Sequence, residues 1–256
     1  MTDRLPPAAL SVRQTLAANA AATAPLLGSL LLLTLLFCAP NGWLEWRDGE
    51  LLAAGVKEHL SPWWLGLAVA LATDTVLQGM ASGLALRRIA EAPASVGEAF
   101  ALPLAALGGL LALAVATAAL AVVGVGLPGL LYSALPNVAT LLLFGASSLV
   151  VLIVSAGWLL AVPVLLAERR APFAALARSW RLTEGVRGKC FLLRALQGVF
   201  VVASTQTGAL FGDALGAYLL RVPATALLLL LPTVAYLRLL AARGEPLPPR
   251  LEELFR

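Results

Sequence analysis

Charged residues are scarce in this sequence, and their scarcity excludes an ordinary soluble domain. Asp, Glu, Lys and Arg make up 12% of the 256 residues, 60% are apolar, and the mean hydropathy is +0.90. A soluble domain contains about 25% charged residues. No Asp, Glu, Lys, Arg or His occurs between Phe100 and Ala167. Because about 20 apolar residues already cross a bilayer as a helix, this run must fold back within the membrane.

Histidine and cysteine are also rare, which argues against metal and catalytic sites. The chain has one histidine, His59, and two cysteines, Cys38 and Cys190. We expect Cys38 near the outer end of one helix and Cys190 near the inner end of another, and we predict no disulfide between them. No H-E-x-x-H motif or serine-histidine-acid set is present, and a G-x-G-x-x-G match at Gly124 follows a membrane helix rather than a strand. We therefore predict no enzymatic activity, no catalytic residue, no cofactor and no metal site.

Alternation with period two is missing as well, which excludes a β-barrel. Ala and Leu dominate six apolar stretches, so we predict an all-α integral membrane protein with six transmembrane helices. The predicted spans cover about 22–39, 63–86, 101–123, 138–167, 190–212 and 217–240. The expected domains are a cytoplasmic amphipathic segment over 1–21, the membrane domain over 22–241 and a cytoplasmic tail over 242–256.

The first apolar stretch also fits the core of a signal peptide, with Arg4 and Arg13 before Leu26–Phe37. The polar lead-in is long and Cys38 is a poor cleavage residue, so we predict a retained span.

Two features of the long uncharged run predict where it changes direction. The Gly- and Pro-rich segment Gly124–Asn137 has turn chemistry and should connect the third and fourth spans. The fourth stretch covers 30 residues, or about 45 Å as a helix. We expect it to tilt, bend near Pro163 or project beyond the bilayer.

The distribution of basic residues predicts the orientation. Fourteen of the 18 Lys and Arg residues fall on one predicted side of the membrane, whereas only Arg47 and Lys57 fall on the other. This asymmetry places both termini in the cytoplasm. We interpret the net charge of +4 as a topology signal and as affinity for anionic lipid, with no nucleic-acid binding.

A weak internal repeat is also present. Proline, a short amphipathic helix and two spans recur from Pro7, Pro93 and Pro172. This pattern predicts three helical hairpins, each preceded by a helix on the cytoplasmic membrane surface.

The segment Val162–Lys189 is the most distinctive in the chain. It contains a proline and a glutamate at the end of a span, then a Ser-Trp-x-Leu sequence and a glycine, at Pro163, Glu168, Ser179, Trp180, Leu182 and Gly185. In this it resembles the membrane domain fused to some bacterial glycerophosphodiester phosphodiesterases, and its free-standing relatives. The resemblance implies a module of the bacterial cytoplasmic (inner) membrane. The chain lacks the acidic ligands and histidines of the phosphodiesterase, so no catalytic residue is carried over.

The amphipathic helix after Pro172 is one candidate site. It is predicted to have an apolar face of Phe173, Leu176, Ala177 and Trp180, with Arg178 and Arg181 on its other faces. Such a helix can lie among lipid headgroups and attract anionic lipid or a partner, with Phe173, Arg178, Trp180 and Arg181 as its contact residues. The alternative is a lateral brace whose arginines only fix the topology.

A second candidate site lies inside the membrane. Asp74 falls near the middle of the second span, where a charged side chain costs about 2.5–3.5 kcal/mol, and Arg194 and Arg221 are its candidate partners. The candidate polar site comprises Asp74, Gln78, Gln197, Thr205 and Gln206. These side chains either line a path for a proton, a cation or a polar substrate, or form a hydrogen-bonded lock between helices.

Three functions remain from these observations. The leading one is a non-enzymatic membrane scaffold or adaptor that binds membrane partners or lipid, since small residues such as Gly79 and Gly83 favour close helix packing, within one chain or in a homo-oligomer. The alternative is a transporter or lipid-handling protein with a polar path near Asp74. An intramembrane enzyme ranks third.

Overall fold

The computed structural model describes residues 11–53, 63–89, 103–210 and 214–246. Every regular element in these ranges is a helix, which confirms the all-α class. Four helical segments among them are long and apolar enough to cross a membrane: Val12–Pro40, Leu107–Ala134, Val138–Glu168 and Tyr218–Ala242. They overlap four of the six predicted spans. The other two correspond to α3 (Trp63–Ile89) and α10 (Arg187–Leu210), which are not among these four.

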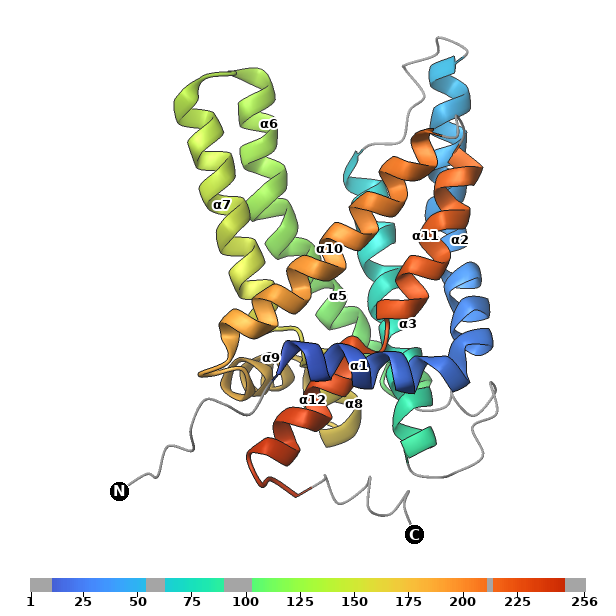
Figure 1. The fold of residues 1–256 in the computed structure, drawn as a ribbon. Coiled ribbons are helices and arrows are strands. Elements are labelled where there is room, and N and C mark those ends of the chain that lie inside the picture. The colour runs from blue at the N-terminus through green and yellow to red at the C-terminus, as the bar shows by residue number, and fades with distance from the viewer. Residues whose placement is uncertain (1–10, 54–62, 90–102, 211–213, 247–256) are drawn as a thin grey trace.

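The first helix lies across the others. α1 (Val12–Thr23) is joined by the 3-10 turn Ala24–Leu26 to α2 (Leu27–Ala53), and Figure 1 shows α1 crosswise beneath the upright helices. The Ser11 hydroxyl accepts a hydrogen bond from the Gln14 backbone N–H (3.4 Å) and so caps α1.

The helix of the first predicted span extends beyond that span. The apolar segment ends at Pro40, close to the predicted end near residue 39, but α2 continues to Ala53. A proline inside a membrane helix removes one backbone hydrogen bond without having to end the helix. The residues after Pro40 include Leu, Glu and Arg, which have high helix propensity, so the helix extends well beyond the apolar stretch.

The predicted turn over Gly124–Asn137 is wrong over most of its length. α5 (Leu107–Ala121) runs through a π-helical segment, Val122–Gly126, directly into α6 (Leu127–Ala134). The wider π turn accommodates the glycines and Pro128 without a break. A Cβ atom on Gly124 would lie 2.1 Å from a Val151 methyl group, so this glycine allows two helices to approach.

The chain reverses only at residues 135–137. Asn137 then starts α7 (Val138–Gly157), and its side chain accepts a hydrogen bond from the Thr140 N–H (3.0 Å) while the Thr140 hydroxyl accepts one from the Asn137 N–H (3.2 Å). This reciprocal capping box explains why the turn falls at Asn137.

Two of the long apolar segments are broken by a short turn before a proline. α7 is separated from α8 (Ala161–Glu168) just before Pro163, and α11 (Ala214–Leu228) is separated from α12 (Leu231–Ala242) just before Pro232. The bend predicted near Pro163 is confirmed. Because proline has no N–H and clashes with the carbonyl four residues earlier, each helix breaks on the N-terminal side of its proline.

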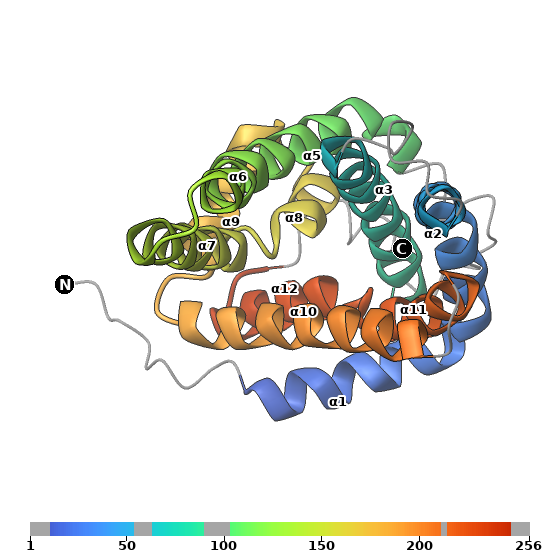
Figure 2. The same ribbon diagram turned by 90° about the horizontal axis from the view of Figure 1, so that it is seen from above.

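Four helices form a layer at one end of the molecule. This basal layer consists of α1, α8, α9 (Pro172–Leu182) and α12, and its members contact one another or the ends of α3 and α5. The long helices rise from it, and Figure 2 shows α2, α3, α5, α6, α7, α10 and α11 arranged around a central region with α8 and α12 toward its middle. One apolar cluster lies within the basal layer and a second lies between α2, α3 and α11.

The helices α1 and α9 use equivalent positions in the same way. The eighth residue of each donates a hydrogen bond to a carbonyl at a helix break: Asn19 Nδ2 to Leu227 O (2.7 Å) and Ser179 Oγ to Gly157 O (2.8 Å). The residue four positions later is buried in both cases: Thr23 at the end of α1 and Thr183 just after α9. The surface helix predicted after Pro93 lies outside the described residues.

Candidate functional site

A cavity of about 620 Å³ lies between the long helices, and α2, α3, α5, α7, α10 and α11 all contribute to its wall. This volume falls in the range of small-molecule sites, which is about 300–1,000 Å³. The apolar wall includes Leu120, Val125, Val151 and Leu152 from α5, the π-helical segment and α7. Figure 1 shows that α7 and α10 lie close together near the basal layer and diverge with distance from it. Both helices contribute residues to the cavity wall.

The polar side of the cavity contains most of the polar and charged helix residues singled out in the sequence. Asp74 and Gln78 come from α3, Arg194 and Gln197 from α10, and Arg221 from α11. Asp74 is surrounded by helices yet exposed to the cavity. Arg194 and Arg221, its candidate partners, line the same cavity. Thr205 and Gln206 belong to α10, but their side chains are not among those that the structure describes.

Gln197 is held in place by two hydrogen bonds. Its Nε2 donates to the carbonyl of Leu228 (3.1 Å), and its Oε1 accepts from Arg194 Nη1 (3.2 Å). The N–H that would reach the Leu228 carbonyl in a continuous helix belongs to residue 232, which is a proline. The break between α11 and α12 therefore fixes Gln197, and Gln197 in turn orients the Arg194 guanidinium toward the cavity.

Several hydroxyl groups that sequence reasoning missed also line the cavity. They belong to Thr73, Thr117, Ser148, Ser155 and Thr225. The Ser148 hydroxyl has no hydrogen-bond partner among the described residues. Single Ser and Thr residues are common in membrane helices, where they can bond to their own backbone, so their type and spacing gave no distinguishing signal.

The second candidate site, on α9, differs from the prediction. The buried face consists of Ala175, Leu176, Ser179 and Leu182, so only Leu176 of the predicted apolar face is buried. Phe173 is 74% exposed, and Ala177 and Arg181 are exposed beside it. The prediction failed because α9 has apolar residues on two faces, and the face that contains Ser179 packs inward.

Ser179 and Trp180 fasten α9 to the break between α7 and α8. The Ser179 hydroxyl donates to the carbonyl of Gly157 (2.8 Å) and accepts from the N–H of Leu160 (3.2 Å). The Trp180 ring covers Gly157 so closely that a Cβ atom there would lie 2.3 Å from it, and the Arg187 guanidinium lies 4.1 Å from the ring centre on Trp180. The Ser-Trp-x-Leu sequence thus has a structural role in this chain.

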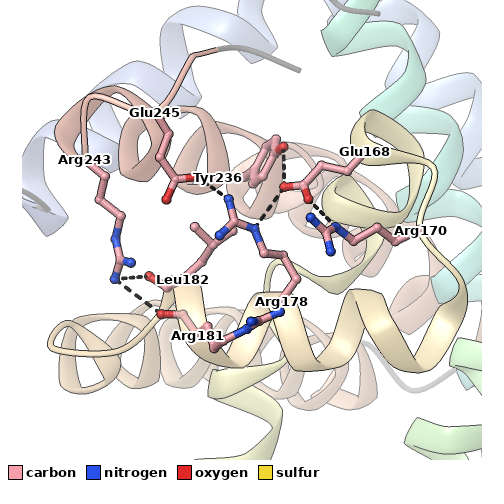
Figure 3. Close-up of polar contacts among 8 residues, drawn as sticks. All are labelled: Glu168, Arg170, Arg178, Arg181, Leu182, Tyr236, Arg243 and Glu245. Atoms are coloured by element: carbon pink, nitrogen blue, oxygen red, sulfur yellow. Dashed lines mark hydrogen bonds and ion pairs between the residues drawn. The ribbon is translucent and has the colours of Figure 1, made fainter. Parts of the chain in front are cut away.

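Arg178 faces the protein interior and joins a charged cluster at the basal layer (Figure 3). Glu168 accepts hydrogen bonds from Arg170 Nε (2.5 Å), Arg178 Nε (3.3 Å) and the Tyr236 hydroxyl (3.2 Å). Arg178 also pairs with Glu245. Burial lowers the pKa of Arg178, but its bond to Glu245 and the charge of Glu168 outweigh burial and raise the pKa above its usual value. Arg178 is therefore a link between α8, α9 and the segment after α12.

A third arginine binds the end of α9 beside this cluster. Arg243, just after α12, donates through Nη2 to the carbonyls of Leu182 (3.0 Å) and Glu184 (3.0 Å). These carbonyls lie at the C-terminal end of α9, where a cation compensates unpaired acceptors. Figure 3 shows Arg243 reaching this end of α9.

These features define a helical membrane protein with a cavity between its helices that has an apolar wall and a charged side. Among the described residues, no group of three His, Cys, Asp or Glu side chains is placed to hold a metal ion. A comparison with protein-family models gives no match, and searches of the curated proteins and of the solved structures give none either.

Proposed function

We propose that this protein handles lipid, by binding an amphiphilic molecule in the cavity between its helices. The observation that supports this proposal is the composition of the wall, which joins Asp74, Arg194 and Arg221 to a long apolar surface. An ion needs only the polar part of such a wall and a hydrocarbon only the apolar part. A molecule with a polar headgroup and an acyl chain uses both.

The cavity changes the ranking of the three functions that the sequence left open. A scaffold or adaptor binds through its outer surface and has no need of charged side chains facing an internal cavity. Placing such groups in a membrane is costly unless they have partners, and intramembrane ionisable residues commonly mark ligand pathways. The lipid-handling alternative therefore replaces the scaffold as our leading proposal, with membrane lipids as the ligands.

The proposal includes the topology. We infer that α3 and α10 complete six spans, with the basal layer at the cytoplasmic surface of a bacterial inner membrane. α3 has 27 residues and α10 has 24, which is enough to cross the hydrocarbon core of about 30 Å. The basal layer carries Arg13, Arg178, Arg181, Arg238 and Arg243, as the positive-inside rule requires of a cytoplasmic surface.

The direct test is to fill the cavity with a side chain. Gly198 lines the cavity, and a Cβ atom added to it meets nothing within 4 Å. Gly145 on α7 is equally open but exposed and not in the cavity wall. The two variants Gly198→Trp and Gly145→Trp therefore add the same ring inside and outside the cavity.

The readout is the lipid retained per protein after gentle extraction, measured by native mass spectrometry. We expect Gly198→Trp to retain less lipid than the wild type and Gly145→Trp to retain the same amount. Equal retention in all three, with folded proteins by thermal unfolding, would contradict lipid binding in the cavity.

A further inference from the structure

The charges in the cavity are unequal. Of the described residues that line it, three are charged, namely Asp74, Arg194 and Arg221. One carboxylate and two guanidinium groups leave a net positive charge. Charges inside a protein attract far more strongly than in water, so this surplus favours an anionic ligand group.

Asp74 occupies the position of a counter-ion. It is exposed to the cavity, and Arg194 and Arg221, which come from two other helices, line the same cavity. A ligand anion that approached both arginines would have to share them with the Asp74 carboxylate. Two negative charges at one place repel each other, so the ligand anion and the Asp74 carboxylate compete for the arginines.

The arginines suit a phosphate group in particular. Guanidinium groups bind phosphate through paired, charge-assisted hydrogen bonds. Arg194 is oriented by Gln197, whose own position is set by the Leu228 carbonyl. Ser148 adds a hydroxyl at the cavity wall that has no hydrogen-bond partner among the described residues. Leu120 and Val151 provide apolar wall for a chain attached to the phosphate.

We propose that the cavity binds the phosphate group of an anionic phospholipid, and that Asp74 is the resident counter-ion which this group displaces from Arg194 and Arg221. This inference rests on the proposed lipid-handling function and names its ligand. Asp74 is the one acidic group among the described residues that share the cavity wall with the two arginines. The headgroup takes over the counter-ion role on binding, which favours anionic over zwitterionic lipid.

The diagnostic variant is Asp74→Asn, because it removes the competing charge and keeps the side-chain shape. The purified protein in detergent is titrated with dioctanoyl phosphatidic acid, dioctanoyl phosphatidylcholine and inorganic phosphate. We expect Asp74→Asn to bind phosphatidic acid about tenfold more tightly, within the usual range of coupling between two groups, and to bind phosphatidylcholine as the wild type does. We expect Arg194→Gln and Arg221→Gln to weaken phosphatidic acid binding by a similar factor.

The matched control is Arg13→Gln, which removes an exposed arginine on α1 far along the chain from the cavity residues. It should leave both affinities unchanged. If Asp74→Asn lowers the melting temperature, phosphatidic acid should raise it by more than in the wild type, since a ligand stabilises only the folded state. This second readout keeps the test valid in a destabilised variant.

Two results would overturn the inference. Weaker or unchanged binding of phosphatidic acid by Asp74→Asn would show that Asp74 does not compete with the headgroup. Equal affinity of the wild type for both lipids would show that the arginines do not select an anion, while a loss of lipid in Gly198→Trp would still support the general lipid-handling function. Inorganic phosphate bound as tightly as phosphatidic acid would support displacement of Asp74 but contradict a lipid ligand.

Discussion

The amide group of Gln197 donates a hydrogen bond to the carbonyl of Leu228, whose usual helical partner would be the missing N–H of Pro232. This contact links the break in one helix to the charged side of the cavity, because Gln197 also accepts a hydrogen bond from Arg194. A proline in the first turn of α12 thus determines where an arginine of α10 lies. In a membrane, freed carbonyls of this kind must find donors from neighbouring helices.

We first predict that Gln197→Leu destabilises the protein by about 1–3 kcal/mol, the usual cost of leaving a buried polar group unsatisfied. The thermal unfolding of the purified protein measures this loss. The exposed Gln14 on α1 accepts a hydrogen bond from Arg238, and Gln14→Leu serves as the control with an expected loss near zero. Similar losses in both variants would contradict a special role for Gln197.

The second prediction concerns the attachment of α9. Replacing Ser179 by Ala removes both its bond to the Gly157 carbonyl and its bond from the Leu160 N–H. We expect a loss of about 1–3 kcal/mol, since both backbone groups are left without this partner. Ser133→Ala, at an exposed serine of α6, should have no measurable effect on chemical or thermal unfolding. An equally mild effect at Ser179 would mean that packing alone holds α9.

The third prediction uses two glycines of the same helix. Gly157→Ala would place a Cβ atom 2.3 Å from the Trp180 ring, whereas Gly145→Ala meets nothing within 4 Å. We expect the first substitution to destabilise the protein, because the ring must move out of its packed position. The second should be neutral or stabilising, by up to about 1 kcal/mol from helix propensity. Melting temperatures of the two variants, measured side by side, test this contrast.

The fourth prediction concerns the charged cluster at the basal layer. Glu168 accepts from Arg170, Arg178 and Tyr236, while Glu245 pairs with Arg178 and is more exposed. We expect Glu168→Gln to cost more stability than Glu245→Gln, for which about 0–1 kcal/mol is typical of an exposed pair. Added salt should shrink the effect of Glu245→Gln, because exposed charges are screened more strongly. The reverse order of the two losses would contradict this account of the cluster.

The fifth prediction tests the proposed topology. In a background without Cys38 and Cys190, single cysteines replace Ser133 near the α6–α7 turn and Arg170 after α8. A membrane-impermeant thiol reagent added to spheroplasts with a sealed inner membrane should label Ser133→Cys but not Arg170→Cys. Lysis should make Arg170→Cys reactive. Labelling of Arg170→Cys before lysis would reverse the orientation.

Sequence reasoning succeeded where a single residue carries a large energetic cost. A carboxylate near the middle of an apolar helix needs partners, so Arg194 and Arg221 were named as candidates for Asp74, and all three residues line one cavity. Pro163 had to disturb a 30-residue apolar stretch, and a break does occur before it. Sequence reasoning failed at Gly124, where glycine and proline are compatible with either a turn or close helix packing.

The face of α9 shows why helix orientation was harder to predict. In water, the apolar face of a helix is the one that packs inward. At a membrane, lipid is as apolar as the protein core, so an apolar residue such as Phe173 can point outward and a polar residue such as Ser179 inward. Periodicity therefore identifies the helix but does not show which face meets the protein.

The sequence alone determined that this chain forms apolar helices and that its few charged groups within them need partners, because hydrophobicity and the cost of burying charge depend on each residue separately. The tertiary structure decided which carbonyls Gln197, Ser179 and Asn19 satisfy, and that Asp74, Arg194 and Arg221 share one cavity. Those outcomes depend on where helices break and how they cross. The physical reason is that bends and crossings bring together residues far apart in the chain, which no local pattern records.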